Sequence, residues 1–164
     1  MGVSGCGKST VGLALARALA LPYVEGDELH PPQNVALMAA GTPLTDADRH
    51  GWLAAVGQRL SDDGARLRGV VVSCSALKRR YRDQLRAAAP QIQFVYLYGA
   101  PALLAQRMAQ RQGHYMPPSL LQSQLDTLEP PAADERALCF DISQGSERIV
   151  SDAVAALAHS PSKP

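Results

Sequence analysis

The chain lacks the features that mark several classes of protein. Its three cysteines, Cys6, Cys74 and Cys139, are widely spaced in 164 residues. They have neither the paired spacing of a zinc site nor the density of a secreted disulfide scaffold, so we expect reduced thiols. The formal net charge is only +1, and no general field would attract nucleic acid or an anionic membrane.

Long apolar runs are also missing. No run approaches the roughly 20 residues of a membrane span, and no charged segment followed by a signal-like apolar stretch opens the sequence. We therefore expect a cytoplasmic protein with no membrane or nucleic-acid partner, whose anionic ligands are held by local sites.

The chain does contain a phosphate-binding loop at its start, where residues 2–9 read GVSGCGKS and fit G-x-x-x-x-G-K-[ST]. Glycines allow the backbone to point N–H groups at phosphate oxygens, and the following helix directs its positive end at the same charge. Lys8 would reach the terminal phosphates as a catalytic group, and Ser9 would offer its hydroxyl to Mg²⁺. A glycine-rich turn that binds nothing is the alternative, but an apolar helical pattern follows the motif, as a functional loop requires. The residues expected to hold ATP are Gly2, Val3, Ser4, Gly5, Cys6, Gly7, Lys8, Ser9 and Thr10, with Arg107 from further along.

A phosphate loop normally leaves the carboxyl end of a buried strand. Only Met1 precedes Gly2 in this sequence. We therefore expect that the strand presenting the loop lies upstream of Met1.

Short apolar runs alternate with helical patterns along the rest of the chain. Strands are predicted at 23–25, 70–74, 94–97 and 137–142, and helices at 8–21, 32–41, 46–60, 78–88, 101–111, 118–127 and 146–158. Asp63-Gly64 is expected to end the third helix. This alternation predicts a doubly wound α/β fold with a parallel sheet, as a single domain over residues 1–158 with a small flap near 107–118 and a disordered tail at 159–164.

An acidic turn follows the first predicted strand. Asp27 would accept a proton from an attacking hydroxyl, orient that hydroxyl, or hold Mg²⁺ through water. A solvated turn in which Asp27 caps a helix is the alternative. Because the strand at 70–74 ends without an aspartate, either Glu25 or Asp27 must anchor the metal. His30 is equally consistent with a ligand and with a hydrogen-bonding turn residue.

Cations follow later strands. Lys78 and Arg79 lie closest to the end of the strand at 70–74 and would clamp an anionic acceptor. Arg107 and Arg111 are spaced one helical turn apart before the flap, and Arg111 would close over the transferring phosphate. For Arg107, a helix-surface role is nearly as well supported.

With these segments in view, the chain resembles the bacterial gluconate kinases (gluconokinases), a shikimate-kinase-like group of the nucleoside monophosphate kinase fold. The segments that carry the resemblance are residues 1–5, 26–27, 29–31, 43–46, 48–49, 74–78, 81–83, 107, 111–114, 123–124, 128–130 and 134–135. Two departures from the pattern are Cys6, where serine is usual, and the absent first strand.

The resemblance implies that Mg-ATP phosphorylates the 6-hydroxyl of D-gluconate. Asp27 would orient or deprotonate the hydroxyl, and Arg49, Lys78 and Arg79 would hold the gluconate carboxylate or hydroxyls. Arg111 would belong to the closing flap, and a homodimer is common in the family. A shikimate or nucleotide kinase of the same fold, or a nucleotide-binding module without catalysis, is the alternative; a GTPase is not expected, since no N-K-x-D motif is present.

Overall fold

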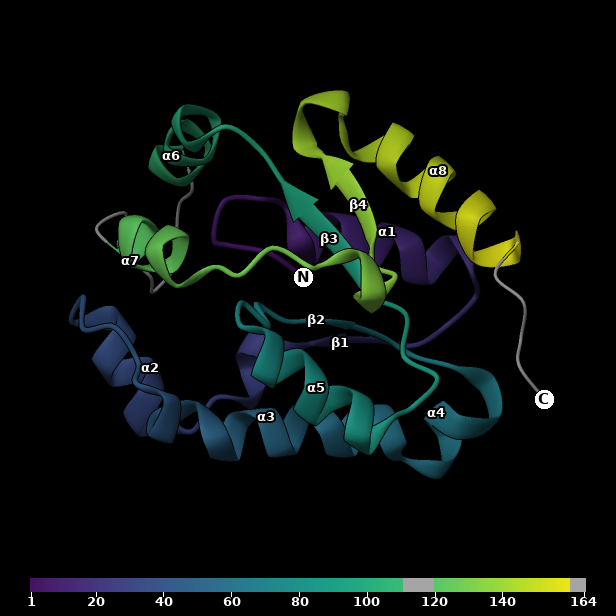
Figure 1. Ribbon diagram of the computed structural model, residues 1–164, viewed down its shortest axis with the longest axis horizontal. Coiled ribbons are helices and arrows are strands. Elements are labelled where there is room, and N and C mark those ends of the chain that lie inside the picture. The colour runs from purple at the N-terminus through teal and green to yellow at the C-terminus, as the bar shows by residue number, and fades with distance from the viewer. Residues whose placement is uncertain (111–119, 160–164) are drawn as a thin grey trace.

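The computed structural model describes residues 1–110 and 120–159 (Figure 1). Its strands form two parallel pairs. Strand β1 (Tyr23–Glu25) pairs with β2 (Val71–Ser73), and β3 (Val95–Tyr98) pairs with β4 (Leu138–Asp141). Val24 lies opposite Val72 in the first pair, and Tyr96 lies opposite Cys139 in the second. The expected parallel α/β fold is confirmed, with its strands in two pairs and the chain start between them.

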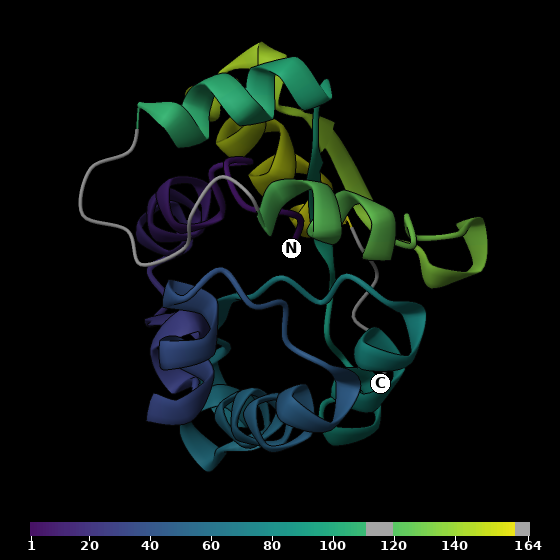
Figure 2. The same ribbon diagram turned by 90° about the vertical axis from the view of Figure 1, so that its left-hand side faces the viewer.

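Helices cover both faces of these strands. The α-helices are α1 (Lys8–Ala18), α2 (Pro32–Ala39), α3 (Asp46–Ser61), α4 (Asp63–Arg68), α5 (Arg79–Ala88), α6 (Pro101–Ala109), α7 (Leu120–Thr127) and α8 (Ser146–His159). Helices α1 and α8 pack together, as do α3 and α5. Figures 1 and 2 show the chain start between the half that carries β1, β2, α3 and α5 and the half that carries β3, β4, α6 and α8.

The two helical layers have separate cores. One buried cluster joins Val11 of α1 to Leu97 of β3 and Ile149 of α8. The other gathers Trp52 and Leu85, from α3 and α5, around the end of β2. The strands therefore lie between two apolar layers, which is why they read as continuous apolar runs in the sequence.

Most element predictions are confirmed, with small shifts at the ends. A capping box, readable in the sequence as Thr45 followed three residues later by Asp48, starts α3: the Asp48 amide donates to Thr45 Oγ1 at 3.3 Å, and the Thr45 amide donates to Asp48 Oδ2 at 2.8 Å. Helix α1 ends at Ala18, before the expected position 21. Helix α3 ends at Ser61, just before Asp63-Gly64 as expected, but the short helix α4 that begins at Asp63 was not predicted.

A buried ion pair fastens the segment before β4 to α5. Arg82 is fully buried, and its guanidinium donates to both carboxylate oxygens of Glu135, at 2.6 and 2.7 Å. Arg86 adds a further hydrogen bond to Glu135 at 2.9 Å. Chiefly through Arg82, these hydrogen bonds lower the pKa of Glu135 to about 2. Lys78, Arg82 and Arg86 are spaced one helical turn apart, but the middle cation is withdrawn from solvent by this pair.

Candidate active site

The loop at residues 2–7 wraps from the strand pairs into α1. Gly7 caps this helix in the left-handed region, at φ 87°, where a side chain would be strained. Lys8 folds back over the loop, and its Nζ donates to the Val3 carbonyl at 3.2 Å. The loop thus has the turn and the helix start that a phosphate site requires, and Lys8 lies across it.

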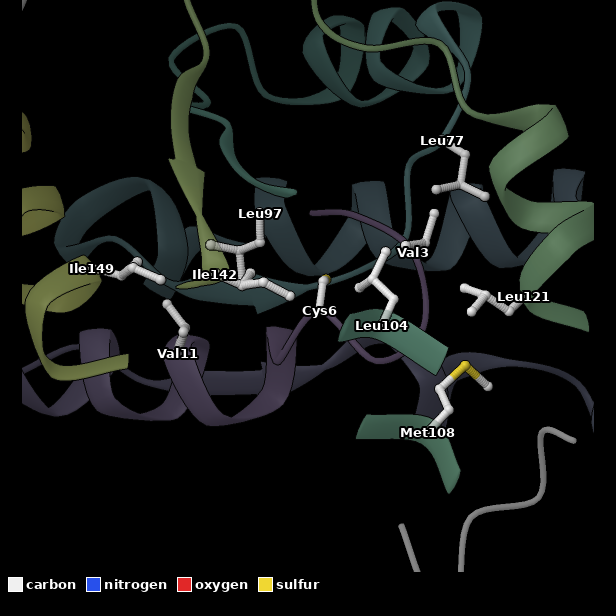
Figure 3. Close-up of a cluster of buried hydrophobic side chains, with 10 residues drawn as sticks. All are labelled: Val3, Cys6, Val11, Leu77, Leu97, Leu104, Met108, Leu121, Ile142 and Ile149. Carbon is white, nitrogen blue, oxygen red and sulfur yellow. The ribbon is translucent and has the colours of Figure 1, made fainter. Parts of the chain in front are cut away.

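Two predicted nucleotide residues turn their side chains away from the loop's open side. Val3 and Cys6 are 2% and 1% exposed, and they pack among Leu97, Leu104 and Ile142 (Figure 3). Their side chains anchor the underside of the loop to the core. Val3 and Cys6 can therefore contact a phosphate only through their backbone N–H groups, as the glycines would.

The carboxylate of Glu25 lies at the end of β1 in a small hydrogen-bond network. The Tyr23 hydroxyl donates to Glu25 Oε2 at 2.7 Å, and the Ser73 hydroxyl bonds the other carboxylate oxygen. A side-chain hydrogen bond also joins Ser9 of the loop to Glu25. Burial opposes the charge on Glu25, but these hydrogen bonds outweigh it and lower its pKa. Glu25 is thus an ionised carboxylate beside the hydroxyl predicted to bind Mg²⁺.

Asp27 follows on a short 3₁₀ turn, Gly26–Leu29, that is held from below. Trp52 is fully buried, and its indole N–H donates to the Gly26 carbonyl at 2.7 Å. A Cβ on Gly26 would lie 2.1 Å from the Ser73 carbonyl oxygen, so only glycine permits this approach of β1 to β2. The turn is therefore fixed in place, and Asp27 with it.

His30 directly follows this turn, and its imidazole ring is buried and stacked. It lies against Trp52 with ring centroids 4.4 Å apart and planes 10° from parallel. Burial lowers the pKa of His30 to about 4, with Asp27 opposing the shift and Arg49 adding to it. His30 is thus neutral at pH 7, close enough to both Asp27 and Arg49 to be influenced by their charges.

Several predicted site residues converge on one point. The charges of Lys8, Asp27 and Glu25 all act on the buried thiol of Cys74, whose pKa is raised chiefly by burial. Asp27 also acts on Arg49, whose pKa is lowered chiefly by burial. The loop and the acidic turn both lie at the carboxyl end of β2, since the Gly2 amide donates to the Ser75 carbonyl and Gly26 lies against the Ser73 carbonyl.

The cations at the start of α5 are already paired within the chain. Lys78 Nζ lies 3.0 Å from Asp46 Oδ1, and that carboxylate also accepts a hydrogen bond from Tyr81. Arg79 makes a two-pronged contact with Asp134, at 2.5 and 3.2 Å. Substrate binding by Lys78 and Arg79 stays a prediction. It would require Asp46 and Asp134 to share these cations with the substrate.

Of the two arginines near the flap, Arg107 has a clear position. Its Nη2 donates to the Ile142 carbonyl at 3.1 Å, and its Nη1 would lie 3.9 Å from a Cβ placed on Gly7. Arg107 therefore lies beside the loop, where its predicted contact with the nucleotide is possible. Arg111 and most of the predicted flap lie outside the described residues.

Comparisons with known proteins agree with this arrangement. A family model described as an AAA domain matches residues 1–131. A gluconokinase from Gluconobacter oxydans is 52% identical over 135 residues, which cover 82% of this chain and 76% of that protein. The chain belongs to the gluconokinase family. The family resemblance and the kinase class expected from the sequence are thereby confirmed.

Solved structures related to the gluconokinase family extend the similarity to the fold. A gluconokinase from Sinorhizobium meliloti is 54% identical with a TM-score of 0.87, covering 96% of this chain and 89% of that one. A sugar kinase from a Janibacter species is 41% identical with a TM-score of 0.91, covering 98% and 93%.

The sequence did not single out every residue that shapes this gluconokinase-family site. Gln124 of α7 accepts a hydrogen bond from the Ser4 amide at 2.7 Å, across 120 residues. Tyr23 and Ser73 orient Glu25, and burial raises the pKa of Tyr23 to about 12. The position of Ser73 at the end of an apolar run pointed to this site, and Gln124 lies in a segment that carries the family resemblance, but no role was expected for Gln124 or Tyr23.

Proposed function

We propose that the protein transfers the γ-phosphoryl group of ATP to the 6-hydroxyl of D-gluconate. Membership of the gluconokinase family supports the substrate. The observation that carries the chemistry is that Lys8 lies across the phosphate loop while Glu25, at the end of β1 just before Asp27, is hydrogen-bonded to Ser9. Phosphoryl transfer needs positioned charge more than covalent chemistry, and this arrangement supplies both signs of charge at one place.

The loop residues would hold ATP. Backbone N–H groups and the start of α1 would face the phosphates, with Lys8 on the terminal ones and Arg107 beside Gly7. Arg111 would add charge from the flap. The γ-phosphorus bond to the ADP oxygen breaks as the bond to the acceptor oxygen forms, so charge gathers where these cations lie.

The residues present also fit Mg²⁺. No cluster of three or more His, Cys, Asp or Glu side chains suited to a metal occurs in residues 1–110 and 120–159, which agrees with a phosphate-loop site, where substrate phosphates and water supply most ligands. Ser9 would bind the ion directly, and Glu25, hydrogen-bonded to Ser9, is better placed than Asp27 to hold its water. When bound, the ion would offset the negative charge of the phosphates.

Asp27 would then serve the acceptor. It would orient the 6-hydroxyl and take its proton as the new P–O bond forms, and the proton is afterwards released to water. Arg49 lies close enough to Asp27 and His30 to bind the acceptor's carboxylate or hydroxyls, and the neutral imidazole of His30 offers a hydrogen bond. Lys78 and Arg79 are proposed to assist from α5, and the homodimer expected from the resemblance stays a prediction.

The decisive test is ADP release from Mg-ATP with D-gluconate, shikimate, AMP or no acceptor. We expect turnover with gluconate, giving one 6-phosphogluconate for each ADP. Turnover with shikimate or AMP in preference to gluconate would overturn the substrate. Nucleotide binding without turnover on any acceptor, in protein whose fold is verified, would favour a binding module.

A further inference from the structure

Two hydroxyl groups reach the carboxylate of Glu25 from the first strand pair. Tyr23 lies two residues before Glu25 in β1, so both side chains point to the same face of the strand. The Tyr23 hydroxyl donates to Glu25 Oε2 at 2.7 Å. Ser73 lies opposite Glu25 in the register of β1 with β2, and its hydroxyl donates to Oε1. Each oxygen of the carboxylate therefore has a donor of its own.

Both donors are held in place by the packing around them. A Cβ on Gly12 of α1 would lie 2.9 Å from Cε2 of Tyr23, so the phenol ring lies directly against the helix backbone. Ser73 is only 4% exposed, and its hydroxyl oxygen lies 3.0 Å from that of Tyr23. Side chains fixed in this way lose little further conformational entropy when they keep their hydrogen bonds. The contacts to Glu25 are therefore built into the packing of β1, β2 and α1.

Two more donors complete the surroundings of this carboxylate. The Ser9 hydroxyl and the Asp27 backbone N–H also form hydrogen bonds with Glu25. A carboxylate offers about four lone pairs to donors. Together with Tyr23 and Ser73, these groups supply four donors from the chain. A metal ion can therefore chelate Glu25 with both oxygens only if donors leave.

Divalent cations differ in how they use a carboxylate. Ca²⁺ takes more oxygen ligands than Mg²⁺ and often chelates both oxygens of one carboxylate, whereas Mg²⁺ keeps several waters and binds few carboxylates directly. Chelation of Glu25 would displace the hydroxyls of Tyr23 and Ser73. A buried donor that loses a charged acceptor is costly. An ion that keeps its waters needs no such displacement, because Ser9 can keep its proton on Glu25 while its oxygen lone pairs face the ion.

We propose that Tyr23 and Ser73 are positioning residues that keep Glu25 from chelating a metal ion and thereby select Mg²⁺ over Ca²⁺. Both residues act through Glu25 and not on the nucleotide or the acceptor. The inference rests on the metal role proposed above for Ser9 and Glu25, and it adds which cation that site accepts.

The test measures, by calorimetry, the binding of a non-hydrolysable ATP analogue as its Mg²⁺ complex and as its Ca²⁺ complex. The parent chain is compared with a double variant, Tyr23→Phe with Ser73→Ala, which keeps the aromatic ring against Gly12 and removes both hydroxyls. We expect the ratio of the Ca²⁺ to the Mg²⁺ affinity to rise by about 10-fold in the double variant. A merely structural role would weaken both complexes alike and leave this ratio unchanged.

A matched control removes one phenol hydroxyl and one serine hydroxyl elsewhere, in Tyr98→Phe with Ser61→Ala. Tyr98 is 42% exposed at the end of β3, and the Ser61 hydroxyl donates to the Gln58 carbonyl at the end of α3. This control should keep the affinity ratio of the parent chain. If the double variant does not fold, Tyr23→Phe alone tests the proposal, with an expected rise in the ratio of about threefold.

An affinity ratio that stays at the parent value in the folded variants, while nucleotide binding still requires a divalent cation, would overturn the selectivity alone. Binding of the analogue by the parent chain with no dependence on a divalent cation would overturn the metal site, and the selectivity with it. Because no phosphoryl group is transferred in these measurements, a wrong acceptor would leave them unchanged.

Discussion

The rings of His30 and Trp52 stack 4.4 Å apart beneath the turn that carries Asp27. Trp52 also holds the Gly26 carbonyl through its indole N–H at 2.7 Å. One fully buried aromatic residue of α3 thus supports both ends of the acidic turn. The position of the proposed acceptor-binding carboxylate therefore depends on packing that lies behind it.

His30 makes the stability of the folded chain depend on pH. Its pKa is about 4 in the folded chain, against about 6.5 when unfolded. Between these values the unfolded chain binds the proton more readily, so stability is full above about pH 6.5 and is lost as pH falls toward 4. In thermal unfolding across this range, His30→Gln should show a weaker loss than the parent chain. His50→Gln, at an exposed position of α3, is the control, and an unchanged pH profile in His30→Gln would contradict the assignment.

The buried pair of Arg82 and Glu135 predicts a large effect from removing one partner. Glu135→Ala leaves the guanidinium of Arg82 buried without its carboxylate and should cost about 3–5 kcal/mol of unfolding free energy. Asp134→Ala removes the neighbouring exposed pair with Arg79 and should lower the unfolding free energy far less. Urea unfolding of both variants measures the difference, and similar losses would show that burial of the Arg82 pair is unimportant.

Asp27→Asn should affect turnover far more than ATP affinity. The amide keeps the shape of the side chain but cannot take a proton, so we expect kcat to fall by about 10²- to 10⁴-fold. ATP binding, measured separately by calorimetry, should change little. Glu28→Gln, one residue further along and exposed, is the matched control. Near-normal turnover in Asp27→Asn would remove Asp27 from the mechanism.

Glu25→Gln should separate the metal role from the acceptor role. Because Glu25 is ionised beside Ser9, its loss should raise the Mg²⁺ concentration needed for nucleotide binding, here by about 10-fold, a factor worth about 1.4 kcal/mol. Titrating Mg²⁺ in the presence of a non-hydrolysable ATP analogue measures this concentration without turnover. Asp27→Asn in the same titration should match the parent chain; a reversed order would move the metal role to Asp27.

Local patterns in the sequence determined the elements of this fold. The apolar run at 70–74 and the capping box at Thr45 each depend on residues close together in the chain, so β2 and the start of α3 were predicted correctly. The phosphate loop is likewise a contiguous motif. Helix α3 also ends before Asp63-Gly64 as expected, whereas the short helix α4 that follows was not predicted.

Only the tertiary structure decided which residues meet. The hydrogen bond from the Ser4 amide to Gln124 spans 120 residues, and the network around Glu25 joins two strands that are separated by 48 positions at Ser73. The helical spacing of Arg82 from Lys78 and Arg86 does not distinguish these cations, yet packing buries Arg82 on Glu135. Sequence patterns specify local conformation because hydrogen bonds within a helix and side-chain alternation are local. Partners across the fold are selected by burial and complementary charge, which exist only once the layers have come together.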